Sequence, residues 1–384
     1  MSRVCIVAAR RTPQGRFRGS LARLSAVELA LSAARATLDG IDSGIIESVI
    51  LGNVLSAGSG MNIARQLSVA LKLPITTSAF TVNMMCASGM QAILLGAQEI
   101  RAGDARCILC GGTESMSNAP FLLRRDAVGQ GLGDVKLVDS LLQDGLIDPF
   151  GNGHMGLTAE RIATDFGITR REQDEYAARS QQRYGRAAAD GVFDRELVPM
   201  AELARDEHPR PQTTPENLAS LKPAFQPDGT VTAGNASGVN DGAAMVLLCD
   251  QATAAQHGLQ PLAYIAGGSA VGCDPAMMGL GPVYATRRLC EILRTEPTAF
   301  DMVELNEAFA AQALACVRQL RLDERRVNPH GGAIAIGHPI GASGARLVVH
   351  LAHRLAAGAA TNALASLCVG GGMGCAVALS RVQD

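Results

Sequence analysis

The sequence contains no tryptophan, and aromatic residues make up only 3% of it. It has no apolar run that reaches the ~18 residues of a membrane span, and its first residues lack the basic and apolar regions of a signal peptide. The net charge of −2 provides no basic face for nucleic acid. Ten cysteines lack the regular spacing of a secreted disulfide scaffold. We therefore expect a protein of the reducing cytoplasm, with free thiols and without nucleic-acid or membrane partners.

Small and aliphatic residues are abundant instead. Hydrophobic residues make up 47% of the chain, carried by Ala, Val, Leu and Ile, and there are 42 glycines. This composition favours helices packed closely on sheets, an α/β fold, and 384 residues exceed one ordinary core. A CxxC at 107–110 lies within an apolar strand, so strand packing explains it better than a metal site. We expect no bound metal.

The segment TVNMMCASGM, residues 81–90, raises the question of what Cys86 does. Val82 and Met84 alternate with polar residues as in a half-buried strand, and the residues after Cys86 have the apolar density of a buried helix. With Ser88 as a cap, free N–H groups at this junction would point toward the sulfur and lower the thiol pKa below its usual ~8.5. This stretch alone fits a nucleophile and a small buried hydrophobic residue equally well.

Residues 86–112 and 341–372 resemble each other. Each has an Ala-Ser-Gly opening, an apolar helix that stops at Ala-Gly, and an apolar strand that ends in Cys followed by glycines. The pattern predicts an old duplication, with two α/β halves whose functional loops meet at a shared face. Residues 117–240 are richer in charge, Pro and polar turns and contain one clear helix around 169–189. We expect them to form an inserted domain that overhangs that face.

The second half supplies further candidates for a functional site. His338 lies in a glycine-rich turn beside Pro339, which favours a functional role over a structural one. Cys368 ends an apolar strand before three glycines, whose N–H groups can approach a ligand closely. Asn306 and Glu307 follow another strand, where they could cap a helix or point into a pocket.

Four loops together resemble those of the thiolase family, and they occur in the family's order over essentially the whole chain. They are CASGM at 86–90, NEAFA at 306–310, GHPIGASGAR at 337–346 and CVGGGMG at 368–374. The resemblance implies two similar halves that form a five-layered αβαβα core with an inserted loop domain.

The resemblance also implies domain boundaries. The N-terminal half would comprise residues 1–116, completed by roughly 241–262, and the C-terminal half residues 263–384. Residues 117–240 would form the loop domain, which would serve coenzyme A binding and oligomerisation.

The chemistry that the resemblance implies is a Claisen condensation between two acyl thioesters of coenzyme A. Cys86 would be the nucleophile that carries the acyl group, and His338 the base that activates it. Cys368 would exchange the α-proton of the second thioester. His338 and a water held by Asn306 would stabilise the enolate, while the N–H groups of Cys86 and Gly370 would hold the tetrahedral intermediate. The glycine run would leave room for the acyl carbonyl.

Coenzyme A thioesters would thus be substrates, and the reaction requires neither a cofactor nor a metal. No G-x-G-x-x-G opens a helix after a strand, so no dinucleotide is expected. Arg210 would lie near the nucleotide of coenzyme A, or simply on the surface. By resemblance, the residues that line the pantetheine arm are His154, Met155, Ser237, Met278, Ala308 and Phe309.

Two segments resemble the biosynthetic branch of the family, which forms acetoacetyl-CoA and is usually tetrameric: HMG at 154–156 and residues 133–146, similar to its tetramer-forming loop. We therefore expect an acetyl-CoA C-acetyltransferase that is a homotetramer, or at least a dimer. The main alternative is a degradative 3-ketoacyl-CoA thiolase of fatty-acid β-oxidation, and a ketoadipyl-CoA thiolase is a third relative. A catalytically silent CoA- or lipid-binding module would be expected to lack one of Cys86, His338 and Cys368.

Overall fold

The computed structural model describes residues 3–127 and 134–382. Its largest sheet has ten strands, and those of the N-terminal half lie in the order β1, β10, β5, β3, β4. The β1–β10 and β10–β5 pairs are antiparallel, and the β5–β3 and β3–β4 pairs are parallel. The strands are β1 (Val4–Arg11), β10 (Asn240–Asp250), β5 (Cys107–Ser115), β3 (Ser48–Gly52) and β4 (Ser78–Val82), and the short β2 (Gly15–Arg16) pairs with β10.

The C-terminal half repeats this order and these strand directions. β11 and β14 are antiparallel, as are β14 and β13, whereas β13 and β12 are parallel. A parallel bridge between Val303 and Val327 takes the place of the β3–β4 pair. The predicted duplication is therefore confirmed. The strands are β11 (Ala263–Gly272), β14 (Met373–Ser380), β13 (Asn362–Val369) and β12 (Met302–Leu305).

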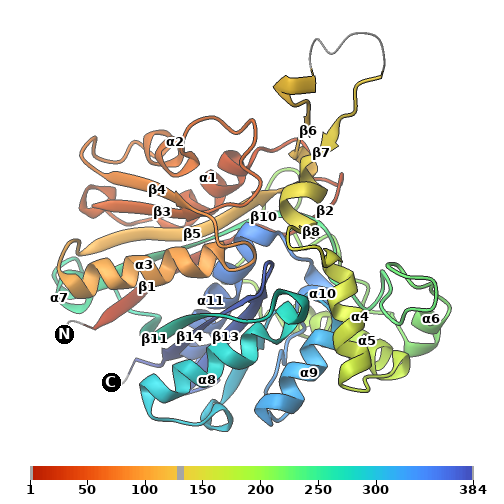
Figure 1. Cartoon of the computed structure of the whole chain (residues 1–384). Helices are drawn as coiled ribbons and strands as arrows, with labels where there is room; N and C mark the ends of the chain where they lie inside the picture. Colours follow the sequence, from red (N-terminus) through yellow and green to blue (C-terminus); the bar gives the residue numbers. More distant parts are fainter. Residues whose placement is uncertain (1–2, 128–133, 383–384) are drawn as a thin grey trace.

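Helices separate and cover the two halves and produce five layers (Figure 1). α3 and α11 lie in the middle, where they share one core with strands of both halves. α1 and α2 cover the outer face of the N-terminal half, and α8 and α9 that of the C-terminal half. The predicted αβαβα fold is confirmed. The helices are α1 (Ala26–Thr37), α2 (Ile63–Ala70), α3 (Ser88–Ala102), α8 (Gly281–Leu293), α9 (Ala310–Leu320) and α11 (Ile340–Ala356).

A long excursion connects β5 to β10. Its longest helix, α5 (Arg170–Ala189), matches the predicted one and begins with a capping box between Thr169 and Glu172. β6 and β7 form an arm that projects from the body (Figure 1). The other elements are η2 (Met116–Asn118), β6 (Phe121–Leu122), η3 (Arg125–Ala127), β7 (Val138–Asp139), η4 (Leu142–Leu146), β8 (Ile147–Asp148), β9 (Gly153–His154), α4 (Met155–Asp165) and α6 (Pro215–Ala219).

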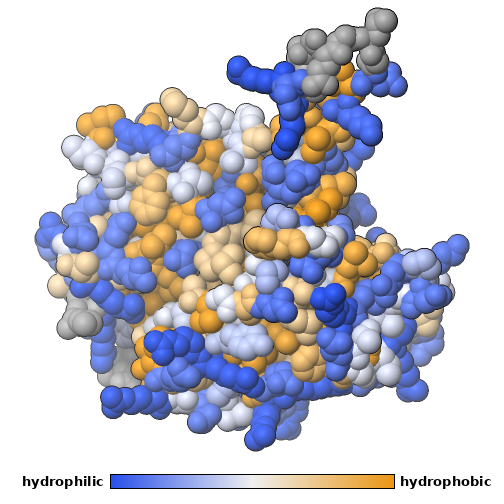
Figure 2. Space-filling view, in the orientation of Figure 1, coloured by the Kyte–Doolittle hydropathy of each residue, from blue (hydrophilic) through white to orange (hydrophobic). Residues whose placement is uncertain are grey.

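Apolar side chains are exposed along this arm and beneath it (Figure 2). Residue 133, the first of the predicted tetramer segment 133–146, lies outside the described residues. Across the described ranges, no helix is both long and apolar enough to cross a membrane. The remaining short helices are η1 (Ser43–Ile45), α7 (Gln251–Gln256), η5 (Pro275–Leu280), η6 (Pro297–Ala299) and α10 (Ala333–Ile336).

Candidate active site

The N-terminal ends of α3 and α11 cross in direct backbone contact. A Cβ atom added to Gly89 in α3 would lie 2.9 Å from the carbonyl oxygen of Gly341 in α11, and one added to Gly112 in β5 would lie 2.1 Å from the same oxygen. Only glycine allows so close an approach. Cys86 and His338 each precede their helix by two residues. The crossing therefore brings together two residues that are far apart in the sequence.

A cavity of about 520 Å³ opens at this crossing. Of the predicted catalytic residues, Cys86, His338, Cys368 and Gly370 line it. Within the described residues, Asn306 is not part of the lining. All seven residues predicted to contact coenzyme A do line the cavity: His154, Met155, Arg210, Ser237, Met278, Ala308 and Phe309.

The backbone just before Cys86 is held in an unusual conformation. Met85 has a φ of +47°, a backbone conformation that residues other than glycine seldom adopt. The Ser88 hydroxyl accepts a hydrogen bond from the Met84 N–H at 2.9 Å and donates one to the Met85 carbonyl at 2.7 Å. The prediction that Ser88 caps α3 is therefore wrong, because its hydroxyl fixes the turn that presents Cys86.

The predicted lowering of the Cys86 pKa is also wrong. Burial in the cavity wall raises the pKa of this thiol to about 11. The backbone N–H groups of Gly370 and of Cys86 itself point at the sulfur and act in the opposite direction, but burial outweighs them. Cys86 is thus a neutral thiol at pH 7, with two N–H donors beside it.

His338 is buried, and its ring is fixed through one nitrogen. The ring nitrogen Nδ1 lies 2.6 Å from the Ser343 hydroxyl. The backbone N–H of His338 donates to Asn240 Oδ1 at 3.0 Å. Nε2 is buried and has no hydrogen-bond partner among the described residues. Burial, and then the charge of Arg346, lower the pKa of His338 to about 4. A neutral imidazole with an unengaged nitrogen on the cavity can accept a proton.

Cys368 ends β13 and is buried, with an exposed fraction of 1%. Burial raises the pKa of its thiol well above the usual value, and the proximity of Cys86 adds to this. Cys86 and Cys368 therefore lie in the same part of the cavity as two neutral thiols.

The glycine run after Cys368 forms the turn between β13 and β14. A Cβ atom at Gly370 would make ordinary contacts of 3.4 Å with Met85 and 3.6 Å with Met155. Gly371 and Gly372, however, have φ values of +86° and +84° in the turn between β13 and β14. This turn therefore requires glycine at Gly371 and Gly372, and room for the acyl carbonyl at Gly370 stays a prediction.

Asn306 and Glu307 have different surroundings. Asn306 is fully buried, its Nδ2 lies 3.5 Å from His338 Nδ1, and within the described chain its Oδ1 has no partner. Glu307 accepts hydrogen bonds from Asn328 Nδ2 at 2.8 Å and from Ser180 Oγ at 2.7 Å. Neither caps α9, which begins only at Ala310. Glu307 thus connects the loop between β12 and α9 to α5, and Asn306 lies beside His338.

The loops predicted to contact coenzyme A hold one another in place. His154 stacks on Phe225 at 4.7 Å between ring centroids, and its Nδ1 accepts the N–H of Gly156 at 3.1 Å. The Ser237 N–H donates to the Ala308 carbonyl at 2.9 Å. Arg210 is exposed at the cavity, where an arginine can meet a phosphate.

Several lining residues were missed by the sequence analysis, among them Gln181, His208, Phe225 and Ile340. His208 and Phe225 lie in the polar part of the excursion, where nothing in the local pattern distinguishes them. Asn240, which holds the His338 backbone, belongs to the stretch NASGVNDGAA at 235–244 and could have been found through it. In the part of the chain that the structure covers, no cluster of His, Cys, Asp and Glu could hold a metal ion.

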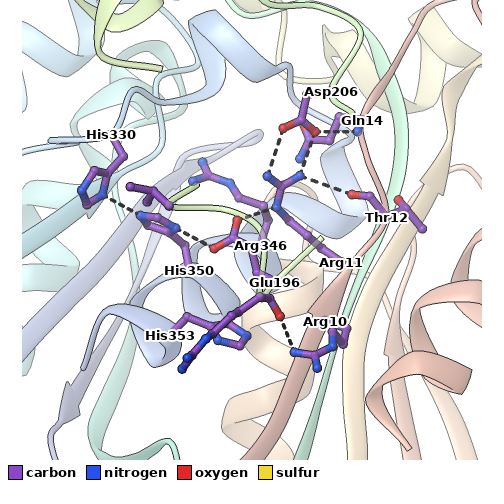
Figure 3. Close-up of polar contacts among 12 residues, drawn as sticks. Arg10, Arg11, Thr12, Gln14, Glu196, Asp206, His330, Arg346, His350 and His353 are labelled. Carbon is purple, nitrogen blue, oxygen red and sulfur yellow. Dashed lines mark hydrogen bonds and ion pairs between the residues drawn. The ribbon is translucent and has the colours of Figure 1, made fainter. Parts of the chain in front are cut away.

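A buried network of charged side chains joins β1, the excursion and α11 (Figure 3). Arg11 donates to Glu196 at 2.7 Å and to Asp206 at 2.8 Å, and the second oxygen of Glu196 lies 2.7 Å from His350 Nδ1. His353 contacts a backbone carbonyl of β1 at 2.9 Å. His350 and His353 therefore have structural roles, and the network anchors the excursion to the core.

Comparison with known proteins gives a consistent result. The family models "Thiolase, N-terminal domain" and "Thiolase, C-terminal domain" match residues 4–252 and 259–381. An acetyl-CoA acetyltransferase of Pseudomonas aeruginosa is 50% identical over 392 aligned positions, which cover 99% of this chain and 100% of that protein.

Solved structures agree with these matches. Human mitochondrial 3-ketoacyl-CoA thiolase in complex with CoA superimposes with a TM-score of 0.97 at 43% identity, covering 100% of this chain and 98% of that one. The acetyl-CoA acetyltransferase of Bacillus anthracis gives a TM-score of 0.96 at 40% identity, covering 100% and 99%. The chain belongs to the thiolase family.

Proposed function

We propose that this protein is an acetyl-CoA C-acetyltransferase, which condenses two molecules of acetyl-CoA to acetoacetyl-CoA and free CoA, reversibly. The observation that carries the proposal is that Cys86, His338, Cys368 and the Gly370 N–H meet at one cavity. The name of the Pseudomonas aeruginosa relative supports the acetyl specificity. No cofactor or metal takes part in the proposed reaction.

In the first half-reaction, Cys86 attacks the thioester carbonyl of acetyl-CoA while its proton passes to Nε2 of His338. The oxyanion of the tetrahedral intermediate accepts hydrogen bonds from the N–H groups of Cys86 and Gly370. The C–S bond to CoA then breaks, and the departing thiolate takes up a proton. The support for this step is the pair of N–H groups beside the Cys86 sulfur and the neutral imidazole of His338.

In the second half-reaction, Cys368 acts as a thiolate, having given its proton to the departing CoA. It removes an α-proton from a second acetyl-CoA, and the enolate carbon attacks the acetyl group on Cys86. The carbon–carbon bond forms, Cys86 leaves as thiolate and takes back the proton held on Nε2 of His338, and acetoacetyl-CoA is released. His338 and a water held by Asn306 stabilise the enolate oxygen; for Asn306 the support is its place beside His338.

Residues 117–240 act in this proposal as the loop domain that binds coenzyme A, between a half of residues 1–116 with 241–262 and a half of residues 263–384. His154, Met155, Ser237, Met278, Ala308 and Phe309 hold the pantetheine arm, and Arg210 lies near the nucleotide. The solved complex of the human relative with CoA supports coenzyme A as ligand. The assembly is a homotetramer, supported by the exposed apolar side chains Phe121, Leu123, Val135, Leu137, Leu142, Ile147 and Phe150.

The proposed compartment is the cytoplasm. Its support is that all ten cysteines lie in the described part of the chain and are free thiols.

A second candidate activity is the thiolysis of longer 3-ketoacyl-CoAs by the same residues. It is favoured by the 43% identity with the human 3-ketoacyl-CoA thiolase, against 40% with the Bacillus anthracis acetyltransferase. Turnover of acetoacetyl-CoA compared with 3-ketoacyl-CoAs of increasing chain length separates the two activities. A clear preference for longer chains would overturn the acetyl specificity.

The chemistry itself is tested by incubation with acetyl-CoA, followed by digestion and mass spectrometry. One acetyl group is expected, on the peptide that contains Cys86, together with condensation activity. Acetylation elsewhere with Cys86 unmodified, or the absence of both acetylation and turnover, would refute the proposal.

A further inference from the structure

Glu114 is a fully buried carboxylate at the end of β5, and the mechanism described above does not use it. Its Oε1 accepts hydrogen bonds from Asn53 Nδ2 at 2.7 Å and the Leu55 N–H at 3.1 Å. Its Oε2 accepts the N–H groups of Val54 at 3.0 Å and Gly341 at 2.9 Å. The four partners that the structure describes are all donors, so only the ionised carboxylate satisfies every one of them.

These partners belong to both halves of the molecule. Asn53, Val54 and Leu55 follow β3 in the N-terminal half, whereas Gly341 lies in the first turn of α11, three residues after His338. A Cβ atom at Gly341 would lie 2.6 Å from Glu114 Oε2, so the helix approaches the carboxylate as closely as glycine permits. A carboxylate at a helix N-terminus is also favoured by the helix dipole.

Glu114 also acts on Cys86 through its charge. Its negative charge raises the pKa of the Cys86 thiol, in addition to the larger effect of burial. Burial, together with the charge of Asp241, raises the pKa of Glu114 itself to about 7. Near and above that pH, Glu114 therefore carries a negative charge that acts on Cys86. Donors from the loop after β3 and from the first turn of α11 hold this charge in place.

We propose that Glu114 is a positioning residue, which holds the first turn of α11, and with it His338, in register with Cys86 while its charge acts on the Cys86 thiol. This inference rests on the proposed function, since it assigns Glu114 a part in the same reaction. The proposal assigns two effects to the Glu114 side chain. Its length holds the first turn of α11 and the loop after β3 in place, and its negative charge disfavours the thiolate form of Cys86.

Two substitutions separate these effects. Glu114→Gln keeps the shape but places an amide NH₂ against N–H donors and removes the charge. We expect kcat for acetoacetyl-CoA thiolysis to fall by about 10²-fold with KM changed less than about twofold, because misalignment affects the reacting groups rather than binding. Iodoacetamide should nevertheless modify Cys86 several-fold faster at pH 8.

Glu114→Asp keeps the negative charge but shortens the side chain. We therefore expect kcat to fall while the rate of Cys86 alkylation stays unchanged.

Glu160→Gln is the matched control. Glu160 is also buried and accepts the N–H groups of Thr230 and Val231. It lies on α4, however, and does not connect the loop after β3 to α11. Its substitution should leave the alkylation rate of Cys86 unchanged. If Glu114→Gln does not fold, as judged by circular dichroism, the Asp variant alone carries the test through its loss of kcat without a change in alkylation.

Two results would overturn the inference. One is an unaltered kcat in both Glu114 variants, and the other is a parallel fall of kcat and alkylation in Glu114→Gln, as expected for simple loss of structure. The alkylation comparison does not require turnover. Absence of thiolysis by the unsubstituted protein would therefore count against the proposed function, while the difference in alkylation between the variants would still test Glu114.

Discussion

At the scale of single residues, the cavity holds a thiol and an imidazole that are both uncharged at neutral pH. Burial raises the pKa of Cys86 to about 11 and lowers that of His338 to about 4, since it disfavours the charged form of each. In the proposed reaction, proton transfer from Cys86 to His338 is therefore coupled to the attack on the thioester rather than completed in advance. A neutral pair also avoids a reactive thiolate in the absence of substrate.

This neutral pair predicts the pH dependence of alkylation. The rate at which iodoacetamide modifies Cys86 should rise with pH from 7 to at least 10, because the thiolate fraction increases up to a pKa of about 11. The rate is measured by peptide mass spectrometry, with Cys86→Ala as the control for the other cysteines. A rate that is already constant between pH 6 and 9 would indicate a thiolate–imidazolium pair and contradict this account.

The sequence identifies the candidate catalytic residues better than their surroundings. Cys86, His338 and Cys368 could be predicted because short glycine-rich motifs mark the turns that present them. The direction of the Cys86 pKa shift could not, since a local junction predicts N–H donors but not the depth of burial. Glu114 was not predictable for a related reason: one of its partners, Gly341, lies 227 residues away in the sequence, in the other half of the molecule.

At the scale of elements, the site depends on the crossing of α3 and α11. The duplication and the helix of 169–189 could be predicted because both follow from local patterns. The backbone contact between the two helices could not, because it involves residues from opposite halves, and glycines alone do not reveal their partners. α4, which carries Met155 into the cavity, was also missed; it lies in a segment whose turns and charges suggested only a loop.

The crossing predicts a contrast between two strand glycines. Gly112→Ala should lower the thermal midpoint clearly and abolish activity, because its Cβ would lie 2.1 Å from the Gly341 carbonyl and force the helix ends apart. Overpacking of this kind typically costs about 1–3 kcal/mol. Gly272→Ala, in β11, is the control, since its nearest described neighbour would be 4.0 Å away. Differential scanning calorimetry and a thiolysis assay compare the two, and equal effects would exclude the crossing as the cause.

At the scale of the whole molecule, the two similar halves together form the candidate active site, and the excursion exposes an apolar surface. The arm formed by β6 and β7 projects from the body, and apolar side chains are exposed along it (Figures 1 and 2). Exposed apolar surface of this kind marks an interaction site. The resemblance of residues 133–146 to a tetramer-forming loop predicts that this surface makes contacts between copies of the chain.

The expected assembly is therefore a homotetramer. Size-exclusion chromatography with light scattering at micromolar concentration measures it, and Phe121→Asp together with Leu137→Asp should reduce the tetramer to dimers without unfolding it, because both side chains are exposed. A dimer for the unsubstituted protein would favour the degradative branch. A monomer would contradict the assignment of the arm.

The central claim is that Cys86 carries the acyl group and Cys368 performs the carbon chemistry. The most direct test is Cys368→Ala, incubated with acetyl-CoA and labelled CoA. It should still acetylate Cys86 and exchange the acetyl group with free CoA, since neither step breaks a C–H bond. Condensation and thiolysis should fall by more than the 10²–10⁴-fold typical of general acid–base catalysis, because a thioester α-proton is a weak acid. Loss of Cys86 acetylation as complete as in Cys86→Ala would contradict this division of roles.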